Sequence, residues 1–267
     1  MSYIAYILTL IDKLIQLKIY DFISCVLETK IWYHYAFSFG DINMQLNERT
    51  LSRQQESLLS THSVLRNTYL LLSLTLLFSA ASAGFAVATN AGFGSSIVAF
   101  IASFALLFIT SALRNSAWGI LSVFAFTGCM GYSLGPMLNH FIHGYSNGSQ
   151  LILTALGGTG LTFFVSSAYV ITTKKDLSGI GKYLMIGLVV CIIASIGNIF
   201  LKMPAMQLAV STLLTFIPVL LMMYDTSRII NNGERNYIMA TISLYLDIQM
   251  LFQNLLMLLG IFGGNRD

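Results

Sequence analysis

Apolar segments of roughly 20 residues follow one another along this chain, and they constrain the fold more than any other feature. A helix of about 20 apolar residues crosses the hydrocarbon core of a bilayer. Because no water is present there to satisfy backbone N–H and C=O groups, only helices and closed barrels can span it. The apolar segments lack the alternating pattern of strands. The sequence therefore predicts an all-α integral membrane protein with a seven-transmembrane-helix bundle.

The composition supports this class and excludes others. Hydrophobic residues make up 56% of the 267 positions and charged residues only 9%, whereas a soluble domain carries about 25% charged residues. The net charge of +3 is small and scattered, so we expect no nucleic-acid partner. The cysteines, Cys25, Cys129 and Cys191, have no CxxC spacing, so we expect no metal site, no cofactor and no disulfide framework.

The breaks between the apolar segments carry turn chemistry such as "TNAGFG", "HGYSNGSQ" and "NNGERN". Residues 44–67 read as a polar cytoplasmic tail, 68–262 as the transmembrane domain and 263–267 as a short C-terminal tail. The spans are expected at roughly 68–89, 93–113, 117–139, 151–171, 183–202, 205–230 and 237–262.

Residues 1–43 differ in texture from the rest of the chain, since charged residues interrupt an Ile- and Tyr-rich segment. The segment has no basic start or cleavage site of a signal peptide. Two interpretations stay open. Either it forms an amphipathic helix at the membrane interface, or translation starts at Met44 and the segment is not part of the protein.

Basic residues predict the orientation in the membrane, because cytoplasmic loops carry the excess of Lys and Arg. Placing the N-terminal side in the cytoplasm leaves the C-terminus on the outer side of the membrane. The cytoplasmic side then receives Arg49, Arg53, Arg66, Arg114, Lys174, Lys175, Lys182, Arg228 and Arg235, and the other side receives Lys202 and Arg266.

Two carboxylates lie within the predicted spans, Asp225 near the end of the sixth and Asp247 inside the seventh. A carboxylate in the bilayer costs about 2.5–3.5 kcal/mol on insertion scales and marks a candidate functional site. A short turn joins the two helices, so they are antiparallel neighbours. We expect the two carboxylates to lie close together and to share a proton. Two structural alternatives stay open: a static hydrogen-bonded pair, or an Asp225 that reaches interfacial water beside Arg228.

The seventh span is polar on more than one face. Ser243, Asp247 and Asn254 follow one line at helical spacing, and Tyr245, Gln249 and Gln253 follow a second. Such a helix fits the centre of a bundle better than its lipid-facing rim, so the last helix is expected to be central.

The stretch "GYSLG" matches the G-x-S-x-G pattern of serine hydrolases around Ser133, but it lacks the strand–turn–helix context of that motif. Its glycines instead predict a small-residue face for close helix packing, with a proline able to kink the helix. These packing residues are Gly128, Gly131, Gly135 and Pro136. We expect no catalytic residues and no enzyme activity. An intramembrane aspartyl protease is a weak alternative, because the motifs around its two aspartates are missing.

Four stretches resemble one family, the YccA-type bacterial proteins of the Bax inhibitor family. They span most of the region after residue 44, and they match in order in both loops and spans. The stretches are "LLSTHSVLRNTYLLLSLTLLFSA", "AFTGCMGYSLGPMLN", "SAYVITTKKDLS" and "GERNYIMATISLYLDIQMLF".

The resemblance implies a seven-helix bundle with the last helix wrapped by the other six. It implies an inner-membrane protein that binds and inhibits FtsH, a membrane-anchored ATP-dependent protease, with the tail at about 44–66 presented to it. Other family members are described as pH-sensitive calcium leak channels, whose sensor is a carboxylate on each of the last two helices with a nearby arginine. Asp225 and Asp247 match these carboxylates, and Arg114 is the candidate arginine.

Overall fold

A computed structural model of the chain describes residues 46–231 and 234–263, with side chains from residue 63 on apart from Ile199. The two interpretations of residues 1–43 lie outside these described residues. The chain divides into two compact units, Met1–Glu56 and Ser57–Asp267. Of the first unit the structure describes only the start of one helix, and the second unit contains the bundle.

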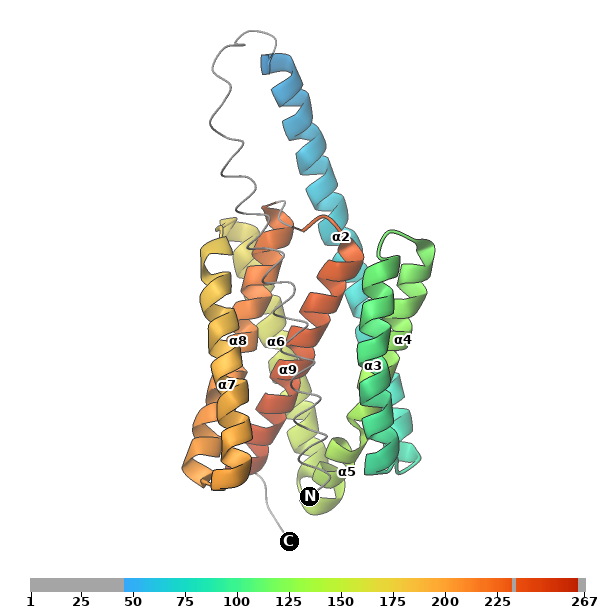
Figure 1. The fold of residues 1–267 in the computed structure, drawn as a ribbon, viewed down its shortest axis with the longest axis vertical. Coiled ribbons are helices and arrows are strands. Elements are labelled where there is room, and N and C mark those ends of the chain that lie inside the picture. The colour runs from blue at the N-terminus through green and yellow to red at the C-terminus, as the bar shows by residue number, and fades with distance from the viewer. Residues whose placement is uncertain (1–45, 232–233, 264–267) are drawn as a thin grey trace. The chain divides into compact units, whose positions relative to one another are not determined.

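All secondary structure within the described residues is helical (Figure 1). In this described part of the chain, seven stretches are long and apolar enough to cross a membrane, so the predicted fold class is confirmed. The helices are α2 (Leu46–Ala88), α3 (Phe93–Leu113), α4 (Ala117–Ser133), α5 (Gly135–Gly144), α6 (Gly148–Thr173), the short 3₁₀ turn η1 (Ser178–Ile180), α7 (Gly181–Leu201), α8 (Pro204–Ile230) and α9 (Tyr237–Gly263).

The first helix, α2, begins well before its membrane span. The apolar stretch starts at Ser63, whereas the helix starts at Leu46. Residues 46–62 are rich in Leu, Glu, Arg and Gln and contain no Gly or Pro, a composition that favours a helix in water as well as in lipid. Part of the segment expected as a polar tail is therefore a helical extension of the first span.

The third span consists of two helices, α4 and α5, which meet at Leu134. Pro136 sits in the first turn of α5, where a missing N–H removes no intrahelical hydrogen bond. The Leu134 N–H turns back to the Gly131 carbonyl at 3.1 Å. The span extends to Gly144, beyond its expected end at residue 139, because α5 continues through the polar residues that follow the apolar run.

The last helix, α9, is central. In its most apolar stretch 50% of the residues are buried, against 17% for α3 and 22% for α7. Figure 1 shows α9 running between the group of α6, α7 and α8 and the pair of α3 and α4. Its side chains belong to two buried clusters, one around Tyr245 and Met222 and one around Phe252 and Phe141. The expectation of a central last helix is confirmed.

Two peripheral pairs flank this centre. On α3, the buried residues Ser96, Ser103 and Thr110 recur every seven positions, a spacing of small side chains that lets the helix pack closely on α4. The outer helix α7 packs through Leu188 and Cys191 against α8. The remaining faces of α3 and α7 carry exposed apolar side chains, as lipid-facing surfaces do.

The connections alternate between two ends of the bundle. The α3–α4 turn, the α6–α7 turn and the α8–α9 connection lie at one end, uppermost in Figure 1. The α2–α3 and α7–α8 connections lie at the other. The basic residues of the first three connections therefore gather at one end, and Lys202 lies at the opposite end.

Candidate functional site

The buried polar residues of α9 form the candidate functional site. Thr241, Tyr245, Asp247 and Gln249 are all buried on this helix, and Asp247 is only 3% exposed. The predicted line through Tyr245 continues to Gln253, which is half-buried. A carboxylate, an amide and two hydroxyls thus face the interior of an otherwise apolar bundle, where each needs a polar partner.

Tyr245 ties α9 to two other helices. Its hydroxyl lies 2.7 Å from Ser79 Oγ on α2 and donates to the Thr127 carbonyl of α4 at 3.2 Å. Its ring meets Phe126 edge-on, with the ring centroids 5.7 Å apart. Because the phenol combines a large apolar area with a satisfied hydroxyl, it can hold three helices together without leaving a polar group orphaned in the core.

Thr241 lies one turn before Tyr245 on α9 and Gln249 one turn after it, and both side chains contact neighbouring helices. The Thr241 hydroxyl donates to the Tyr237 carbonyl at 2.7 Å and also lies 3.3 Å from the Thr68 carbonyl of α2. Gln249 Nε2 lies 3.5 Å from the Met130 carbonyl of α4, while its Oε1 is buried and accepts no hydrogen bond from the described residues. The side of α9 that carries Thr241, Tyr245 and Gln249 thus faces α2 and α4 over several turns.

The two predicted carboxylates lie on neighbouring helices. Asp247 is buried about three turns into α9, and Asp225 is half-buried on α8 between one and two turns before its end. At 1.5 Å per residue these positions differ in depth by about 8 Å for parallel axes. Beside Asp225, the Thr226 hydroxyl lies 3.5 Å from the Tyr69 hydroxyl of α2. That Asp225 and Asp247 lie close together, and that they share a proton, stay predictions.

The predicted arginine, Arg114, is exposed in the turn after α3. Its backbone, rather than its guanidinium, contacts the α9 region, because Asn236 Nδ2 donates to the Arg114 carbonyl at 2.9 Å. Asn236 also donates to Asn115 Oδ1 at 3.0 Å. Through Asn236 the α3–α4 turn is thus fastened to the start of α9.

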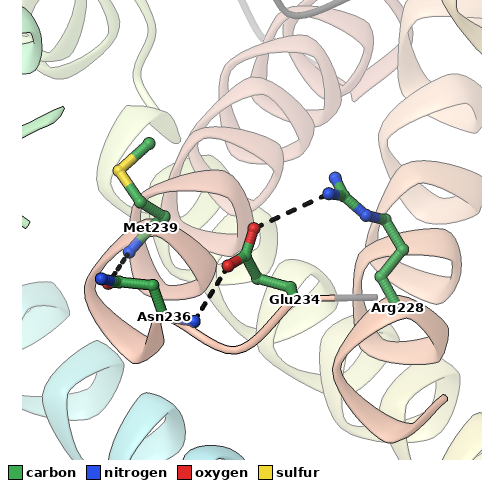
Figure 2. Close-up of polar contacts among 4 residues, drawn as sticks. All are labelled: Arg228, Glu234, Asn236 and Met239. Atoms are coloured by element: carbon green, nitrogen blue, oxygen red, sulfur yellow. Dashed lines mark hydrogen bonds and ion pairs between the residues drawn. The ribbon is translucent and has the colours of Figure 1, made fainter. Parts of the chain in front are cut away.

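The connection between α8 and α9 holds a compact polar group that the sequence reasoning missed (Figure 2). The Arg228 guanidinium lies 3.7 Å from Glu234 Oε2, and Glu234 Oε1 accepts the Asn236 N–H at 2.9 Å. Asn236 Oδ1 in turn accepts the N–H groups of Ile238 and Met239 at 3.0 and 3.2 Å. Asn at the position before an apolar helix is a capping signal, and it could have been recognised from the sequence.

The packing glycines lie where α4 and the start of α5 approach α2. A Cβ at Gly131 would overlap the Ser79 carbonyl oxygen, and one at Gly128 would lie 2.7 Å from the Phe78 ring. A Cβ at Gly135 would lie 2.7 Å from the Ala86 Cβ. The Ser79 that approaches Gly131 is also the partner of Tyr245, so close packing and the polar bonds of α9 depend on the same helix position.

We searched the described residues for a metal site and for the setting of a serine nucleophile around Ser133. They contain no cluster of three or more His, Cys, Asp or Glu able to hold a metal ion. The hydroxyl of Ser133 donates to the Met130 carbonyl at 2.7 Å, a common local bond of serine within helices. The stretch around Ser133 thus forms the junction of α4 and α5, in place of the strand–turn–helix that the hydrolase motif needs.

These features define a class, the helical membrane proteins built around a central and polar last helix. The family model described as "Inhibitor of apoptosis-promoting Bax1" matches residues 61–265 of the chain. The chain belongs to the Bax inhibitor family.

The chain matches several bacterial proteins over almost the full length of each of them. The protein "Modulator of FtsH protease YccA" of Escherichia coli strain K12 is 46% identical over 209 residues, which are 78% of this chain and 94% of the relative. An uncharacterized membrane protein of Vibrio cholerae is 44% identical over 220 residues, 81% of this chain and 97% of the relative. An uncharacterized protein of Pseudomonas aeruginosa is 43% identical over 221 residues, 83% of this chain and 97% of the relative.

Proposed function

We propose that this protein is an inner-membrane modulator of FtsH, which binds that protease and slows its proteolysis of other membrane proteins. The observation that carries the proposal is the 46% identity to the Escherichia coli modulator over 94% of that relative. A second Escherichia coli relative of the same identity and coverage is named an inner membrane protein. A match of this extent leaves few surfaces of the relative without a counterpart here.

The proposal assigns the contact with the protease to the N-terminal part of α2, within residues 44–66. The bilayer-length part of this helix begins at Ser63, and the helix itself begins at Leu46. This part of the helix lies outside the apolar span and is polar in sequence, with charges at Glu48, Arg49, Arg53 and Glu56. It therefore suits contact with a protease domain that stands above the same bilayer, whereas the lipid-facing spans do not.

The test measures the half-life of an unassembled membrane substrate of FtsH in cells with raised levels of this protein. We expect a longer half-life and co-purification of FtsH from solubilised membranes. Deleting residues 46–56 should abolish both effects while the bundle still inserts. Deleting residues 1–43 is the matched control, because it also shortens the N-terminal side but leaves all of α2, which begins at Leu46, in place, and it should leave both effects intact. An unchanged substrate half-life at high expression contradicts the proposal.

The proposed orientation places the N-terminus in the cytoplasm and the C-terminus in the periplasm. It is supported by the gathering of Arg114, Lys174, Lys175 and Lys182 at one end of the bundle, because basic residues favour the cytoplasmic side. The same orientation puts the extension of α2 on the cytoplasmic side. The proposed protease contact and the proposed topology therefore both require that the N-terminal side of the bundle faces the cytoplasm.

A second candidate function is a pH-sensitive leak for calcium or another cation, with Asp225, Asp247 and Arg114 as its gate. The observation that favours it is the near-complete burial of Asp247 on the central helix. A buried carboxylate at this depth is costly, and ionising it as pH rises adds a charge that the bundle has to accommodate by moving helices. In this proposal the Arg114 backbone transmits such a movement, because it holds Asn236 at the start of α9.

Flux across liposomes at different pH values separates the second candidate from the first. If Asp247 gates a leak, Asp247→Asn and Asp225→Asn should each remove the pH dependence of the flux. Asp176→Asn is the matched control, because Asp176 lies exposed in a loop, and it should change nothing. A pH response that survives both substitutions assigns the carboxylates to packing and leaves the FtsH proposal untouched.

A further inference from the structure

The turn between α6 and α7 carries a cluster of exposed cations. Lys174, Lys175 and Lys182 are all exposed there, within nine positions of one another. The only acid in this interval is Asp176, whose carboxylate accepts the Ser178 N–H at 2.9 Å. This bond lowers the pKa of Asp176, so it stays charged, and the turn keeps a net positive charge.

The turn is held in one conformation from two sides. Lys174 adopts the left-handed conformation, with φ 50°, and its N–H donates to the Val170 carbonyl at 2.8 Å. From α8, the Ser227 hydroxyl accepts the Leu177 N–H at 2.9 Å and donates to the Lys175 carbonyl at 3.0 Å. The lysines are therefore presented by a fixed backbone, which reduces the entropy lost when they bind a ligand.

A fourth cation, Arg228 of α8, lies near the turn between α6 and α7. Gly181, at the start of α7, packs on the Tyr224 ring of α8, where a Cβ would lie 2.5 Å from the ring carbons. The Arg228 guanidinium lies 5.7 Å from the centroid of the same ring. Since Glu234 pairs with Arg228 at 3.7 Å, this arginine adds to the positive field only in part. The three lysines make up the exposed front of the cluster.

The cluster adjoins the ends of two membrane spans, where a bilayer carries its headgroups. The adjoining spans end at Thr173 and begin at Ser178. Tyr169 is 46% exposed and Tyr183 is 75% exposed on the two helices. Exposed tyrosines at the ends of spans are typical of the membrane–water interface. Lysines beside them can extend their amines toward phosphates while their stems stay along apolar surface.

We propose that Lys174, Lys175 and Lys182 form a binding surface for the phosphate groups of anionic phospholipids. An acidic protein segment is the rival partner, and the apolar and aromatic flanks decide between the two. A lipid offers a phosphate next to acyl chains, which matches lysines next to exposed Tyr169 and Tyr183. A soluble acidic peptide matches only the charge. Clusters of basic residues next to membrane spans bind anionic lipids in the same way.

The test uses the purified full chain in detergent and measures lipid binding by native mass spectrometry. Phosphatidylglycerol and phosphatidylcholine of equal chain length are the probes. We expect Lys174→Gln to weaken phosphatidylglycerol binding about fivefold, which corresponds to about 1 kcal/mol per lysine. Replacing all three lysines with Gln should remove the preference for phosphatidylglycerol. Raising the ionic strength to about 0.5 M should weaken binding by the wild type.

The chain offers a closely matched control in Lys202. It is exposed, it ends α7 with φ 49°, and its N–H donates to the Asn198 carbonyl at 2.8 Å. Lys202→Gln therefore removes the same charge from the same backbone geometry at the opposite end of the bundle. It should leave the lipid preference unchanged. The triple Lys→Arg variant should retain the preference, and it keeps the test decisive if the triple Gln variant fails to fold.

Several results overturn the proposal. One is equal wild-type affinity for the two lipids, and another is an equal loss in Lys174→Gln and Lys202→Gln. Competition by soluble glycerol phosphate at concentrations equal to the lipid shows that the site recognises a free phosphate and not a lipid. Tighter binding of a polyglutamate peptide than of phosphatidylglycerol assigns the surface to an acidic protein.

Discussion

Replacing Gly131 with alanine tests how tightly the centre of the bundle is packed. The added Cβ would overlap the Ser79 carbonyl oxygen and approach Ser79 Oγ at 2.7 Å. Neither Ser79 atom can move away easily. The carbonyl oxygen belongs to the backbone, and Oγ is hydrogen-bonded to the Tyr245 hydroxyl at 2.7 Å. To make room, α4 has to move away from α2.

The expected cost follows from two contributions. Overpacking of a tight contact costs about 1–3 kcal/mol. Shifting Ser79 weakens its bond to Tyr245, and interhelical hydrogen bonds in membranes are worth about 0.6 kcal/mol, with a maximum of about 1.7. Together we expect Gly131→Ala to lower the free energy of unfolding by about 2–4 kcal/mol.

The matched control is Gly160→Ala on α6. Gly160 lies inside a span, is exposed and has open space where a Cβ would be. Alanine is the better helix former by up to about 1 kcal/mol, so this variant should be as stable as the wild type or more so. Unfolding in mixed micelles with rising dodecyl sulfate, followed by helical circular dichroism, measures both. If Gly131→Ala is no less stable than Gly160→Ala, the packing described for α2 and α4 is wrong.

Three further outcomes are expected. Tyr245→Phe should cost about 1–2 kcal/mol of unfolding free energy through its lost bonds to α2 and α4, whereas Tyr183→Phe, at a 75% exposed position, should cost nothing measurable; equal effects would refute the reasoning. Asn236→Ala should cost about 1 kcal/mol as a lost helix cap and should speed hydrogen exchange in the α3–α4 turn, and unaltered exchange there would exclude the tie. A phosphatase reporter that is active only in the periplasm should be active after residue 267 and inactive in the α6–α7 turn, and the opposite pattern would invert the proposed topology.

The architecture could be predicted from the sequence because it depends on one strong signal. Each apolar run is long enough to cross a bilayer, and polar turn residues separate the runs. The central place of α9 was also accessible, since Asp247 and Gln249 cannot face lipid without large cost. Both residues are buried in the bundle. The hydropathy of the chain and the free-energy cost of exposing polar groups to lipid were thus sufficient to predict the fold class and the central place of α9.

Details that depend on other signals could not be derived in this way. The helix of α2 reaches back to Leu46 because polar residues such as Glu and Gln are good helix formers, which an apolar window does not record. Ser227 fastens the α6–α7 turn across more than fifty positions of sequence. No local pattern in a single sequence indicates such a long-range bond. The depths of Asp225 and Asp247 depend likewise on tilt and on Pro218 within α8, which spacing alone does not fix.

The most direct test of the proposed function reconstitutes purified FtsH, a membrane substrate and this protein in the same liposomes with ATP. The quantity measured is the degradation rate of the substrate as the ratio of this protein to FtsH increases. We predict that the rate falls as the ratio rises, and that the variant lacking residues 46–56 leaves the rate unchanged at every ratio. A rate that is independent of the full chain, in liposomes where both proteins are inserted and FtsH is active, contradicts the account.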